Sequence, residues 1–400
     1  MRRGATLLIG VTGSVAAYKS VDLVRRLGDR GAAVDVIMTE AAQRFITPLS
    51  LQLASGDRLY SDMWHSPLSH ISLPAGKDLF LIAPATADII GKYAHGIADD
   101  LLSTALLAYQ GKVMIAPAMN ARMWENPVVQ QNLALLADRG VMTVGPERGI
   151  LACGDEGVGR MAEVETILDA VEAALSPQDL ARERVLVTAG PTREYLDPVR
   201  YLSNRSSGKM GFALATVARR RGAQVTLVTG PVSLRPPDGV RVIRVESASD
   251  MHRAVMDCLA SSTVLIMSAA VADFRPSETA ACKVDKKEEF EVRLDRTVDI
   301  LGEIGRLDRR PFTVGFAAET GPRLDRAKEK LAAKRCDLIV FNDVSRQGSG
   351  FDVDTNEVVI IGRDEERKVP LMSKEEVAGT ILDRVAELRQ ASQGQHGGTS

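Results

Sequence analysis

Short apolar runs alternate with segments of helical periodicity along this chain, and the alternation limits the possible folds more than any other feature. Residues 7–11 form an apolar run, residues 14–30 carry apolar side chains at helical spacing, and residues 34–38 form a second apolar run. A strand, a helix and a strand in this order predict a βαβ unit, which requires a parallel sheet. The same half adds two buried strands and a last helix at residues 78–83, 112–116 and 166–175.

The alternation starts again near residue 183, which predicts a second parallel sheet. Its further elements are predicted at residues 185–188, 211–221, 224–229, 265–268, 313–316, 324–334, 338–341, 358–361 and 373–390. A chain of 400 residues is too long for one ordinary core, so two α/β domains are expected. The polar, Pro-containing segment 176–183 is the predicted linker. We therefore expect domains at residues 1–178 and 179–390, and a polar, Gly-rich, disordered tail at residues 391–400.

Composition excludes several classes of function. The net charge is −2, from 50 basic and 52 acidic side chains, so nothing predicts nucleic-acid binding. No apolar run approaches the ~20 residues that span a bilayer, and the short run after Arg2 and Arg3 is typical of a first strand rather than of a signal peptide. The four cysteines are widely spaced and form no CxxC pair, which argues against a zinc site or a disulfide framework and favours a reducing cytoplasm.

Two loops of the first half follow predicted strands and could receive a phosphate. The loop at residues 10–19 resembles a dinucleotide-binding turn but lacks the GxGxxG spacing, and a turn of this kind also closes many strand–helix corners. The loop at residues 83–88 offers another hydroxyl at the same sheet edge, where ligands of open parallel sheets gather. Together the two loops favour a mononucleotide such as FMN.

Three further residues of this half are candidates for chemistry. His70 lies on an apolar segment, where a histidine is either structural or catalytic. Asn120 in PAMNARMW (residues 117–124) is either a helix N-cap or a functional amide. Cys153 in ACGDEG (residues 152–157) lies in a Gly-rich acidic segment, which predicts a flexible loop and a functional thiol rather than a buried small hydrophobe.

His70, PAMNARMW and ACGDEG occur in the order found in the flavin-containing cysteine decarboxylases, and residues 5–175 resemble phosphopantothenoylcysteine decarboxylases in particular. The resemblance implies that FMN oxidises the substrate cysteine to a thioaldehyde, which delocalises the carbanion left by CO₂, and then returns the electrons. It implies that His70 assists the oxidation, Asn120 holds the substrate carboxylate and amide, and Cys153 supplies a proton. The FMN contacts that it implies are Ser14, Thr39, Thr86 and Ser103.

The stretch at residues 189–211 is the clearest candidate of the second half. It follows a strand and opens a helix, where backbone amides and the helix dipole favour an anion. Its SSGKMG segment is not a P-loop, because GxxxxGK[ST] fails at the first Gly and at the final Ser or Thr. Asp273 and Phe316 lie at or near the ends of later strands, and Lys330 and Lys334 are four residues apart on one helix, so they could hold a polyphosphate.

Residues 183–388 resemble phosphopantothenate–cysteine ligases. The resemblance is carried by TAGPTRE (188–194), DPVRYLSNRSSGKMG (197–211), AAVADF (269–274), GFAAET (315–320) and NDV (342–344). It implies activation of the 4′-phosphopantothenate carboxylate as an acyl-cytidylate with CTP and Mg²⁺, followed by attack of the cysteine amine. Asn204 would orient the acyl intermediate, and Lys283 would assist its formation or breakdown. The implied CTP contacts are Ser268, Ala269, Asp273, Lys283, Val298, Asp299, Ile300, Leu301, Phe316, Lys330 and Lys334.

With both resemblances in one chain, the sequence is similar to the bacterial bifunctional coenzyme A biosynthesis family. The implied fold is two Rossmann-like three-layer domains, the first of them flavodoxin-like, and the implied assembly is a homo-oligomer, a dodecamer. Mg²⁺ would bind mainly through the CTP phosphates, with Asp273 as a possible ligand. The reaction sequence would be ligation to 4′-phosphopantothenoylcysteine and then decarboxylation to 4′-phosphopantetheine.

Two alternatives stay open: a flavin-binding scaffold without chemistry, and a peptidyl-cysteine decarboxylase whose second half is inactive. The retained His70, Asn120 and Cys153 argue against the first, and the intact SNRSSG (203–208) argues against the second. One departure concerns the ligase lysine, because Asp285 stands where the family usually has a basic residue. Lys283 is the aligned residue, and Lys286 or Lys287 takes its place if the register differs.

Overall fold

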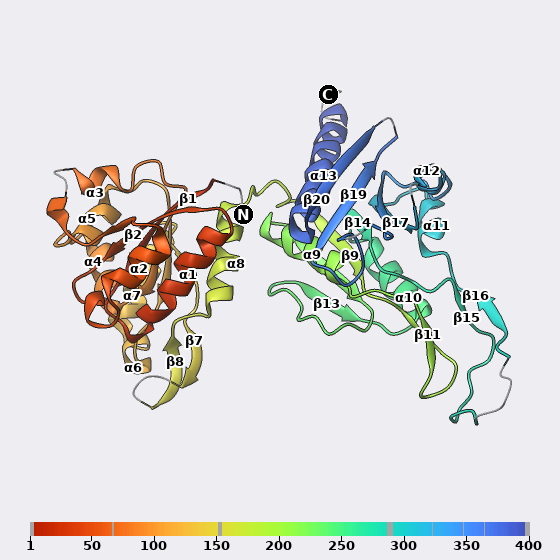
Figure 1. The fold of residues 1–400 in the computed structure, drawn as a ribbon, viewed down its shortest axis with the longest axis horizontal. Coiled ribbons are helices and arrows are strands. Elements are labelled where there is room, and N and C mark those ends of the chain that lie inside the picture. The colour runs from red at the N-terminus through yellow and green to blue at the C-terminus, as the bar shows by residue number, and fades with distance from the viewer. Residues whose placement is uncertain are drawn as a thin grey trace. The chain divides into compact units, whose positions relative to one another are not determined.

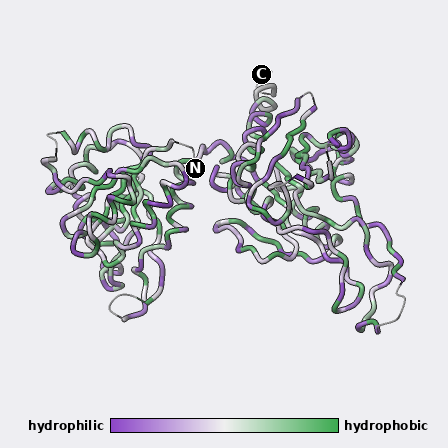
Figure 2. Tube along the Cα trace, viewed as in Figure 1, coloured by the Kyte–Doolittle hydropathy of each residue, from purple (hydrophilic) through white to green (hydrophobic). Residues whose placement is uncertain are grey.

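The computed structural model describes residues 4–65, 68–150, 154–285, 291–321, 323–346, 348–363 and 365–396. The chain divides into two compact units, Met1–Ser176 and Pro177–Ser400. Each unit is an α/β domain with a parallel sheet between two layers of helices, which confirms the predicted fold class (Figure 1). Figure 2 shows the hydrophobic stretches gathered inside each unit.

The sheet of the first unit is parallel throughout, with the strand order β3-β2-β1-β4-β5-β6. Its strands are β1 (Thr6–Val11), β2 (Ala33–Met38), β3 (Leu59–Tyr60), β4 (Leu79–Ala85), β5 (Lys112–Pro117) and β6 (Met142–Thr143). Without the two-residue edge strand β3, this is the flavodoxin-like order. The chain order reverses between β1 and β4, and ligands of such sheets bind at the carboxyl ends of the strands at that point.

Helices cover both faces of this sheet because its strands are apolar on both sides. Leu7 and Ile9 of β1 face one buried cluster and Leu8 faces the other. The first cluster includes side chains of α1 (Tyr18–Asp29), α2 (Pro48–Ser55) and α8 (Val164–Leu175), and the second those of α4 (Ala87–His95), α5 (Leu101–Ala108) and α7 (Pro127–Asp138). The shorter elements are η1 (Val15–Ala17), η2 (Ala42–Arg44), η3 (Met63–His65), α3 (Ser69–Ser72), α6 (Ala121–Trp124), and a hairpin of β7 (Glu147–Ile150) and β8 (Glu156–Arg160).

The sheet of the second unit has the order β13-β12-β9-β14-β17-β18-β19-β20, in which only β19 runs antiparallel to its neighbours. Its strands are β9 (Arg184–Ala189), β12 (Gln224–Thr229), β13 (Arg241–Arg244), β14 (Val264–Met267), β17 (Phe312–Glu319), β18 (Leu338–Asp343), β19 (Thr355–Ile361) and β20 (Glu366–Ser373). The order reverses between β9 and β14, which is the switch point of this unit.

Two helices cover one face of the second sheet and three cover the other. Side chains of α9 (Lys209–Arg220) and α13 (Lys374–His396) belong to one buried cluster, and those of α10 (Ala248–Leu259), α11 (Ile300–Gly305) and α12 (Leu324–Ala333) belong to another. Two hairpins, β10 (Arg193–Tyr195) with β11 (Tyr201–Ser203) and β15 (Phe274–Pro276) with β16 (Leu294–Arg296), lie outside the sheet.

The structure corrects two expectations about local structure. The predicted disorder of residues 391–400 is wrong for residues 391–396, which continue α13, while residues 397–400 lie outside the described ranges. Polar composition alone does not end a helix, because extending a formed helix by one residue costs little. Residues 156–160, predicted as part of a flexible loop, form strand β8, since pairing with β7 satisfies their backbone.

Candidate active sites

The loops after β1 and β4 are bonded to each other at the switch point of the first unit. The Thr12 hydroxyl donates to the Pro84 carbonyl at 2.7 Å and accepts from the Thr86 amide at 3.2 Å. This buried hydroxyl fixes the two loops that carry Ser14 and Thr86. Thr12 was not among the predicted site residues, although it lies in the loop at 10–19, and its position between two strand ends becomes visible only once the strands are paired.

Three predicted flavin contacts gather at this edge, in the segments that follow the neighbouring strands β2, β1 and β4. The Thr39 amide donates to the Val11 carbonyl at 3.1 Å, so Thr39 lies beside the end of β1. The Ser14 hydroxyl accepts from the Ala16 amide. Thr86 is the N-cap residue of α4, and its side chain makes no capping hydrogen bond. Three hydroxyl side chains and the amino-terminal amides of a helix at one sheet edge fit the phosphate of a flavin mononucleotide.

The fourth predicted contact, Ser103, has a different position. Its side chain is buried and forms a capping box at the start of α5, with its hydroxyl 2.7 Å from Asp100 Oδ1 and 3.0 Å from the Asp100 amide. The first turn of α5 packs onto the end of β1, because a Cβ on Gly10 would lie 2.5 Å from Leu102 Cδ1. Ser103 therefore holds the helix start that borders the edge.

Asn120 directly follows β5 and caps α6. Its Oδ1 accepts from the Arg122 amide at 2.9 Å, which confirms the N-cap interpretation and fixes the orientation of the side chain. The hairpin β7–β8 lies against this segment, since the Met119 amide donates to the Gly159 carbonyl at 2.9 Å. A Cβ on Gly159 would lie 2.2 Å from the Met119 carbonyl oxygen, so only glycine allows this approach. Cys153, predicted to be a functional thiol in a flexible loop, lies outside the described residues.

His70 lies far from Asn120 within one chain. It is a half-buried residue of α3, which packs against α5. Figure 1 shows α3 and α6 at opposite ends of the first unit. One copy of the chain therefore does not assemble the predicted catalytic pair.

In the second unit, a ladder of hydrogen bonds joins the loops after β9 and β14. The Ala270 amide donates to the Gly190 carbonyl at 2.9 Å, and the Ala272 amide donates to the Thr192 hydroxyl at 3.0 Å. The Asn204 side-chain amide donates to the Val271 carbonyl at 2.9 Å. These bonds bring the stretch 189–211 and the segment 268–273 together at the switch point, with Asn204 exposed on top of them.

Asp197 holds the segment of Lys283 beside this platform. The fully buried carboxylate accepts from the Val199 and Arg200 amides, each at 2.8 Å, from the Arg200 guanidinium, and from the Val284 amide at 3.2 Å. Burial opposes its ionisation, but these donors outweigh burial and hold the pKa of Asp197 well below its usual value. Lys283, next to Val284, is thereby placed near the stretch 189–211. Sequence reasoning missed the role of Asp197, and its only signal was the turn-forming Asp-Pro pair.

A second group of predicted nucleotide contacts lies around α12. The Lys330 ammonium donates to the Phe316 carbonyl at 2.7 Å, and the Lys334 ammonium forms an ion pair with Asp299. Burial lowers the pKa of Lys330, and Asp273 is close enough to act on it electrostatically in the opposite direction. Burial also opposes the charge of Asp299, but Lys334 and the Gly302 amide hold the pKa of Asp299 below its usual value.

The remaining predicted contacts divide by exposure. Val298 is exposed, whereas Ile300 and Leu301 are buried in the cluster beneath α12, so they support the site rather than contact a ligand by their side chains. The Ser268 hydroxyl donates to the Thr188 carbonyl at 2.6 Å, and the Ala269 amide donates to the Thr188 hydroxyl. These two residues therefore build the platform, and a nucleotide at this point would contact their backbone.

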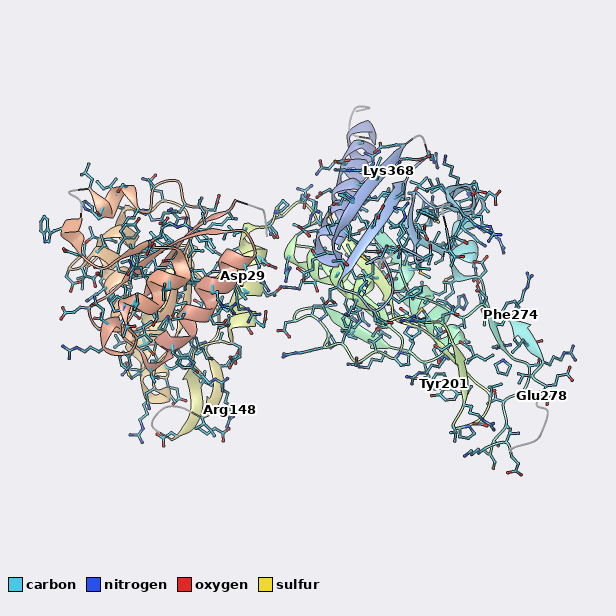
Figure 3. All side chains as sticks on the ribbon, viewed as in Figure 1. Asp29, Arg148, Tyr201, Phe274, Glu278 and Lys368 are labelled. Atoms are coloured by element: carbon cyan, nitrogen blue, oxygen red, sulfur yellow. The ribbon has the colours of Figure 1, made fainter. Side chains whose placement is uncertain are left out.

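The hairpins beside this site carry exposed apolar side chains. Tyr201 on β11 and Phe274 on β15 are labelled in Figure 3, on the outer part of the second unit. Val199, Leu294 and Val298 are exposed nearby in the sequence. Arg193 lies over the Tyr201 ring at 4.6 Å from its centroid, which fixes that ring on the hairpin.

The residues that the structure describes contain neither a metal-ligand cluster nor a membrane-spanning helix. Among the described residues, no three or more His, Cys, Asp or Glu side chains gather as a metal site would require. Within the same ranges, every helix is too short or too polar to cross a bilayer.

Two family models divide the chain between them. Residues 1–176 match the Flavoprotein family, and residues 180–388 match the DNA/pantothenate metabolism flavoprotein C-terminal domain. The coenzyme A biosynthesis bifunctional proteins CoaBC of Vibrio cholerae serotype O1 and Escherichia coli K12 are 45% and 46% identical over 392 residues. These matches cover 96% of this chain and 98% and 97% of those proteins. A crystal structure of a CoaBC C-terminal domain is 40% identical, covers 54% of this chain and 99% of its own, and has a TM-score of 0.47.

Proposed function

This chain belongs to the coenzyme A biosynthesis bifunctional protein family, and from this premise we propose how its two units divide the work. It is an enzyme of coenzyme A biosynthesis with two activities. Pro177–Ser400 ligates cysteine to 4′-phosphopantothenate, and Met1–Ser176 decarboxylates the resulting 4′-phosphopantothenoylcysteine. The relatives match over nearly the whole chain, which leaves neither half without a role and argues against a scaffold or an inactive second half. The observation that supports this division best is that each unit has its own switch point bordered by its own candidate residues.

In the ligase unit, CTP is the proposed activating nucleotide. Lys330 and Lys334 would hold the triphosphate, with Mg²⁺ bound through the phosphates and Asp273 as its candidate protein ligand. The substrate carboxylate attacks the α-phosphorus and pyrophosphate leaves, giving an acyl-cytidylate. Asn204, held on the Val271 carbonyl, orients the acyl group while the cysteine amine displaces CMP. Lys283 is the proposed catalytic lysine, because Val284 is fixed by Asp197 beside the platform.

In the decarboxylase unit, FMN is the proposed cofactor, and it supplies a reversible two-electron oxidation of the substrate thiol when bound. Ser14, Thr39 and Thr86 would hold its phosphate at the switch point. Asn120 would orient the substrate carboxylate, and its cap hydrogen bond to Arg122 keeps it in place. Cys153 is the proposed proton donor in the reductive step.

The test measures both reactions in one purified sample. We expect the chain, given CTP, Mg²⁺, 4′-phosphopantothenate and cysteine, to release CMP, pyrophosphate and CO₂. Asn204→Asp should abolish CMP release and leave CO₂ release from added 4′-phosphopantothenoylcysteine intact, and Asn120→Asp should do the reverse. If either substitution removed both activities, two separate sites would be excluded. ATP in place of CTP tests the choice of nucleotide.

The separation of His70 from Asn120 points to a decarboxylase site completed by a second copy, in line with a homo-oligomer. His70→Asn and Asn120→Asp variants should each be inactive alone. Co-expressed in one cell, they should regain part of the CO₂ release, because some sites then combine an intact His70 with an intact Asn120. Mixed oligomers without any regained activity would place both residues in one copy.

A further inference from the structure

A cavity of about 790 Å³ lies at the amino-terminal edge of the second sheet. Arg310 and Cys336, which line it, shortly precede β17 and β18, and Gly362 follows the antiparallel strand β19. This is the edge opposite the switch point, so the cavity is distinct from the proposed ligase site. Its volume is within the range of small-molecule sites.

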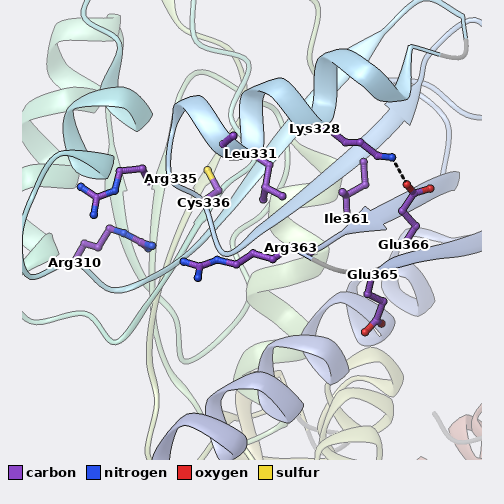
Figure 4. A pocket seen from close by; sticks show the side chains of 11 residues that line it. Arg310, Lys328, Leu331, Arg335, Cys336, Ile361, Arg363, Glu365 and Glu366 are labelled. Atoms are coloured by element: carbon purple, nitrogen blue, oxygen red, sulfur yellow. Dashed lines mark ion pairs between the residues drawn. The ribbon is translucent and has the colours of Figure 1, made fainter.

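The acidic side chains that line this cavity are neutralised by partners. Glu366 forms an ion pair with Lys328 at 2.5 Å, which Figure 4 marks with a dashed line. Glu365 forms an ion pair with Arg384 at 2.6 Å, on α13. Neither carboxylate therefore adds a net negative charge that would repel an anion.

Two of the three arginines that line the cavity leave it with an excess of positive charge. Arg310 is paired with Asp337 at 2.6 Å. Arg335 and Arg363 have no acidic partner within the ranges that the structure describes, and both are exposed to solvent. Figure 4 shows the three guanidinium groups in the part of the pocket that lies away from Lys328 and Glu366, with those of Arg310 and Arg363 pointing toward each other. Guanidinium groups with open forks favour oxyanions that accept two hydrogen bonds.

The backbone holds Arg335 in this position at a cost. Arg335 has φ +50°, a left-handed conformation that is uncommon for a residue with a side chain. The turn is confined by α11, because a Cβ on Gly305 would lie 2.2 Å from the Lys334 carbonyl oxygen. The turn sends Lys334 to Asp299 and Arg335 to the cavity.

The other wall of the cavity is apolar. Leu331 and Ile361 are buried side chains on it, beside the Cys336 thiol. Burial raises the pKa of Cys336 to about 11, so the thiol stays neutral and adds no negative charge at physiological pH. A ligand that fills this space needs an apolar part next to its anionic group.

We propose that this cavity is a binding site for a small organic phosphate monoester, separate from the catalytic sites. Arg335 and Arg363 hold the phosphate oxygens, and the organic part packs on Leu331 and Ile361. The guanidinium groups of Arg335 and Arg363, which have no acidic partner among the described residues, match a dianion. A phosphate with an apolar body matches the divided lining.

The test is calorimetric titration of the whole chain with inorganic phosphate and with phenyl phosphate, at constant ionic strength and without nucleotide. Arg335→Gly removes the guanidinium and suits φ +50°, so it should fold at least as well as the wild type. Arg363→Ala removes the second group. Arg367→Ala is the matched control, because Arg367 is exposed on β20 and does not line the cavity.

We expect Arg367→Ala to bind each anion with the affinity of the wild type. Both proteins should bind phenyl phosphate more tightly than inorganic phosphate. Arg335→Gly and Arg363→Ala should each lose one site or weaken it about tenfold or more, which equals about 1.4 kcal/mol. The substitutions leave the other phosphate sites of the enzyme unchanged, so binding at those sites is the same in all four proteins. Equal binding by all four proteins, or no saturable binding by the wild type, overturns the proposal.

Discussion

Lys330 is the residue whose surroundings most constrain the proposed nucleotide site. Its ammonium is half-buried and donates to the Phe316 carbonyl, and burial lowers its pKa. The negative charge of a bound triphosphate would oppose this effect of burial and favour the charged ammonium. We therefore expect Lys330→Met to lower kcat/KM for CTP by about 10- to 100-fold, equal to ~1.4–2.7 kcal/mol of lost transition-state binding.

The control is Arg326→Met on the same helix, where the exposed side chain reaches Glu319 at 3.5 Å. It should keep ligase activity, measured as pyrophosphate release. An unchanged KM and kcat in Lys330→Met would remove Lys330 from the nucleotide site.

Gly211 is required by the close contact of α9 with the sheet. A Cβ at this position would lie 2.5 Å from Ala189 Cβ and 2.7 Å from the Ser268 hydroxyl. We expect Gly211→Ala to destabilise the second unit by about 1–3 kcal/mol through overpacking, and to lower ligase activity. Gly379→Ala is the control, because a Cβ there meets nothing within 4 Å inside α13 and should stabilise slightly. Denaturant unfolding followed by circular dichroism distinguishes the two, and an unfolding curve of Gly211→Ala like that of Gly379→Ala would contradict the packing argument.

At the scale of residues, the sequence predicted the side chains whose chemistry is visible in a motif and missed those that act through position. Asn120 and Asn204 were both predicted as site residues, and both lie in loops. Thr12 and Asp197 were not predicted as site residues, because each acts by bonding two segments that are far apart in the chain. A hydroxyl or carboxylate of that kind has no local signature. The catalytic roles assigned to His70, Asn120, Cys153, Asn204 and Lys283 all stay predictions.

At the scale of elements, the Asp197 turn joins the β10–β11 hairpin to the segment before Lys283. The depressed pKa of Asp197 means that its ionised form favours the fold above the pKa of an unfolded aspartate, and that this contribution falls as pH drops toward the folded pKa. Asp197→Asn removes the charge at every pH. We expect about tenfold lower ligase activity and faster tryptic cleavage at Lys283, because the Val284 amide loses its carboxylate acceptor.

Asp295→Asn is the control for this prediction, since Asp295 is an exposed residue of β16. It should be cleaved at the wild-type rate. Equal cleavage of Asp197→Asn and wild type would show that the turn does not hold the Lys283 segment.

Tyr109, at the end of α5, has a raised pKa. The Tyr109 hydroxyl donates to the Lys77 carbonyl at 3.0 Å, and burial, with Asp78 nearby, raises the pKa of Tyr109 to about 12. The neutral phenol therefore stabilises the fold fully below about pH 10, the unfolded pKa, and this contribution is lost as pH rises toward 12. Tyr109→Phe should cost about 1 kcal/mol at pH 8 but lose less stability than wild type between about pH 10 and 12.

Both tryptophans, Trp64 and Trp124, belong to the first unit, so tryptophan fluorescence reports its unfolding without a signal from the second. Denaturant midpoints from about pH 8 to 12 give the comparison. Tyr109 also contacts Phe80, at 5.6 Å between ring centroids, and the phenylalanine ring of the Tyr109→Phe variant keeps this contact. Parallel pH profiles of the two proteins would show that Tyr109 does not titrate as argued.

Elements with apolar runs were predicted well, and elements held only by pairing were not. Strand β12 (Gln224–Thr229) has the predicted bounds. Strand β20 (Glu366–Ser373) was missed because it is mostly exposed and polar, and only the pairing with β19 makes it a strand. The same holds for β8, whose glycines predicted a loop. Edge pairing is a tertiary effect that a local pattern does not contain.

At the scale of the whole molecule, the alternation of strands and helices predicted two parallel sheets, because a βαβ unit has one common topology. It did not predict that the candidate residues of the first unit would divide between two ends of that unit. His70 and Asn120 are both in the first unit, yet α3 and α6 lie at its opposite ends. A motif in one chain records both residues without recording the distance between them.

The two units should work when separated, because each has its own buried clusters. The buried clusters of the first unit end at Val171, and those of the second begin at Leu180. A cut between Ser176 and Pro177 falls at the boundary of the compact units, outside every one of these clusters. We expect fragments 1–176 and 177–400 each to fold with the secondary structure of the whole chain. The first should be yellow and release CO₂ from 4′-phosphopantothenoylcysteine, and the second should release CMP. Mixed together at the concentration of the intact protein, they should complete both steps with rates within a few-fold of its rates, since the product of one site diffuses to the other. A fragment that folds but has lost its reaction by more than about 100-fold, ~2.7 kcal/mol, would mean that each site needs the other unit.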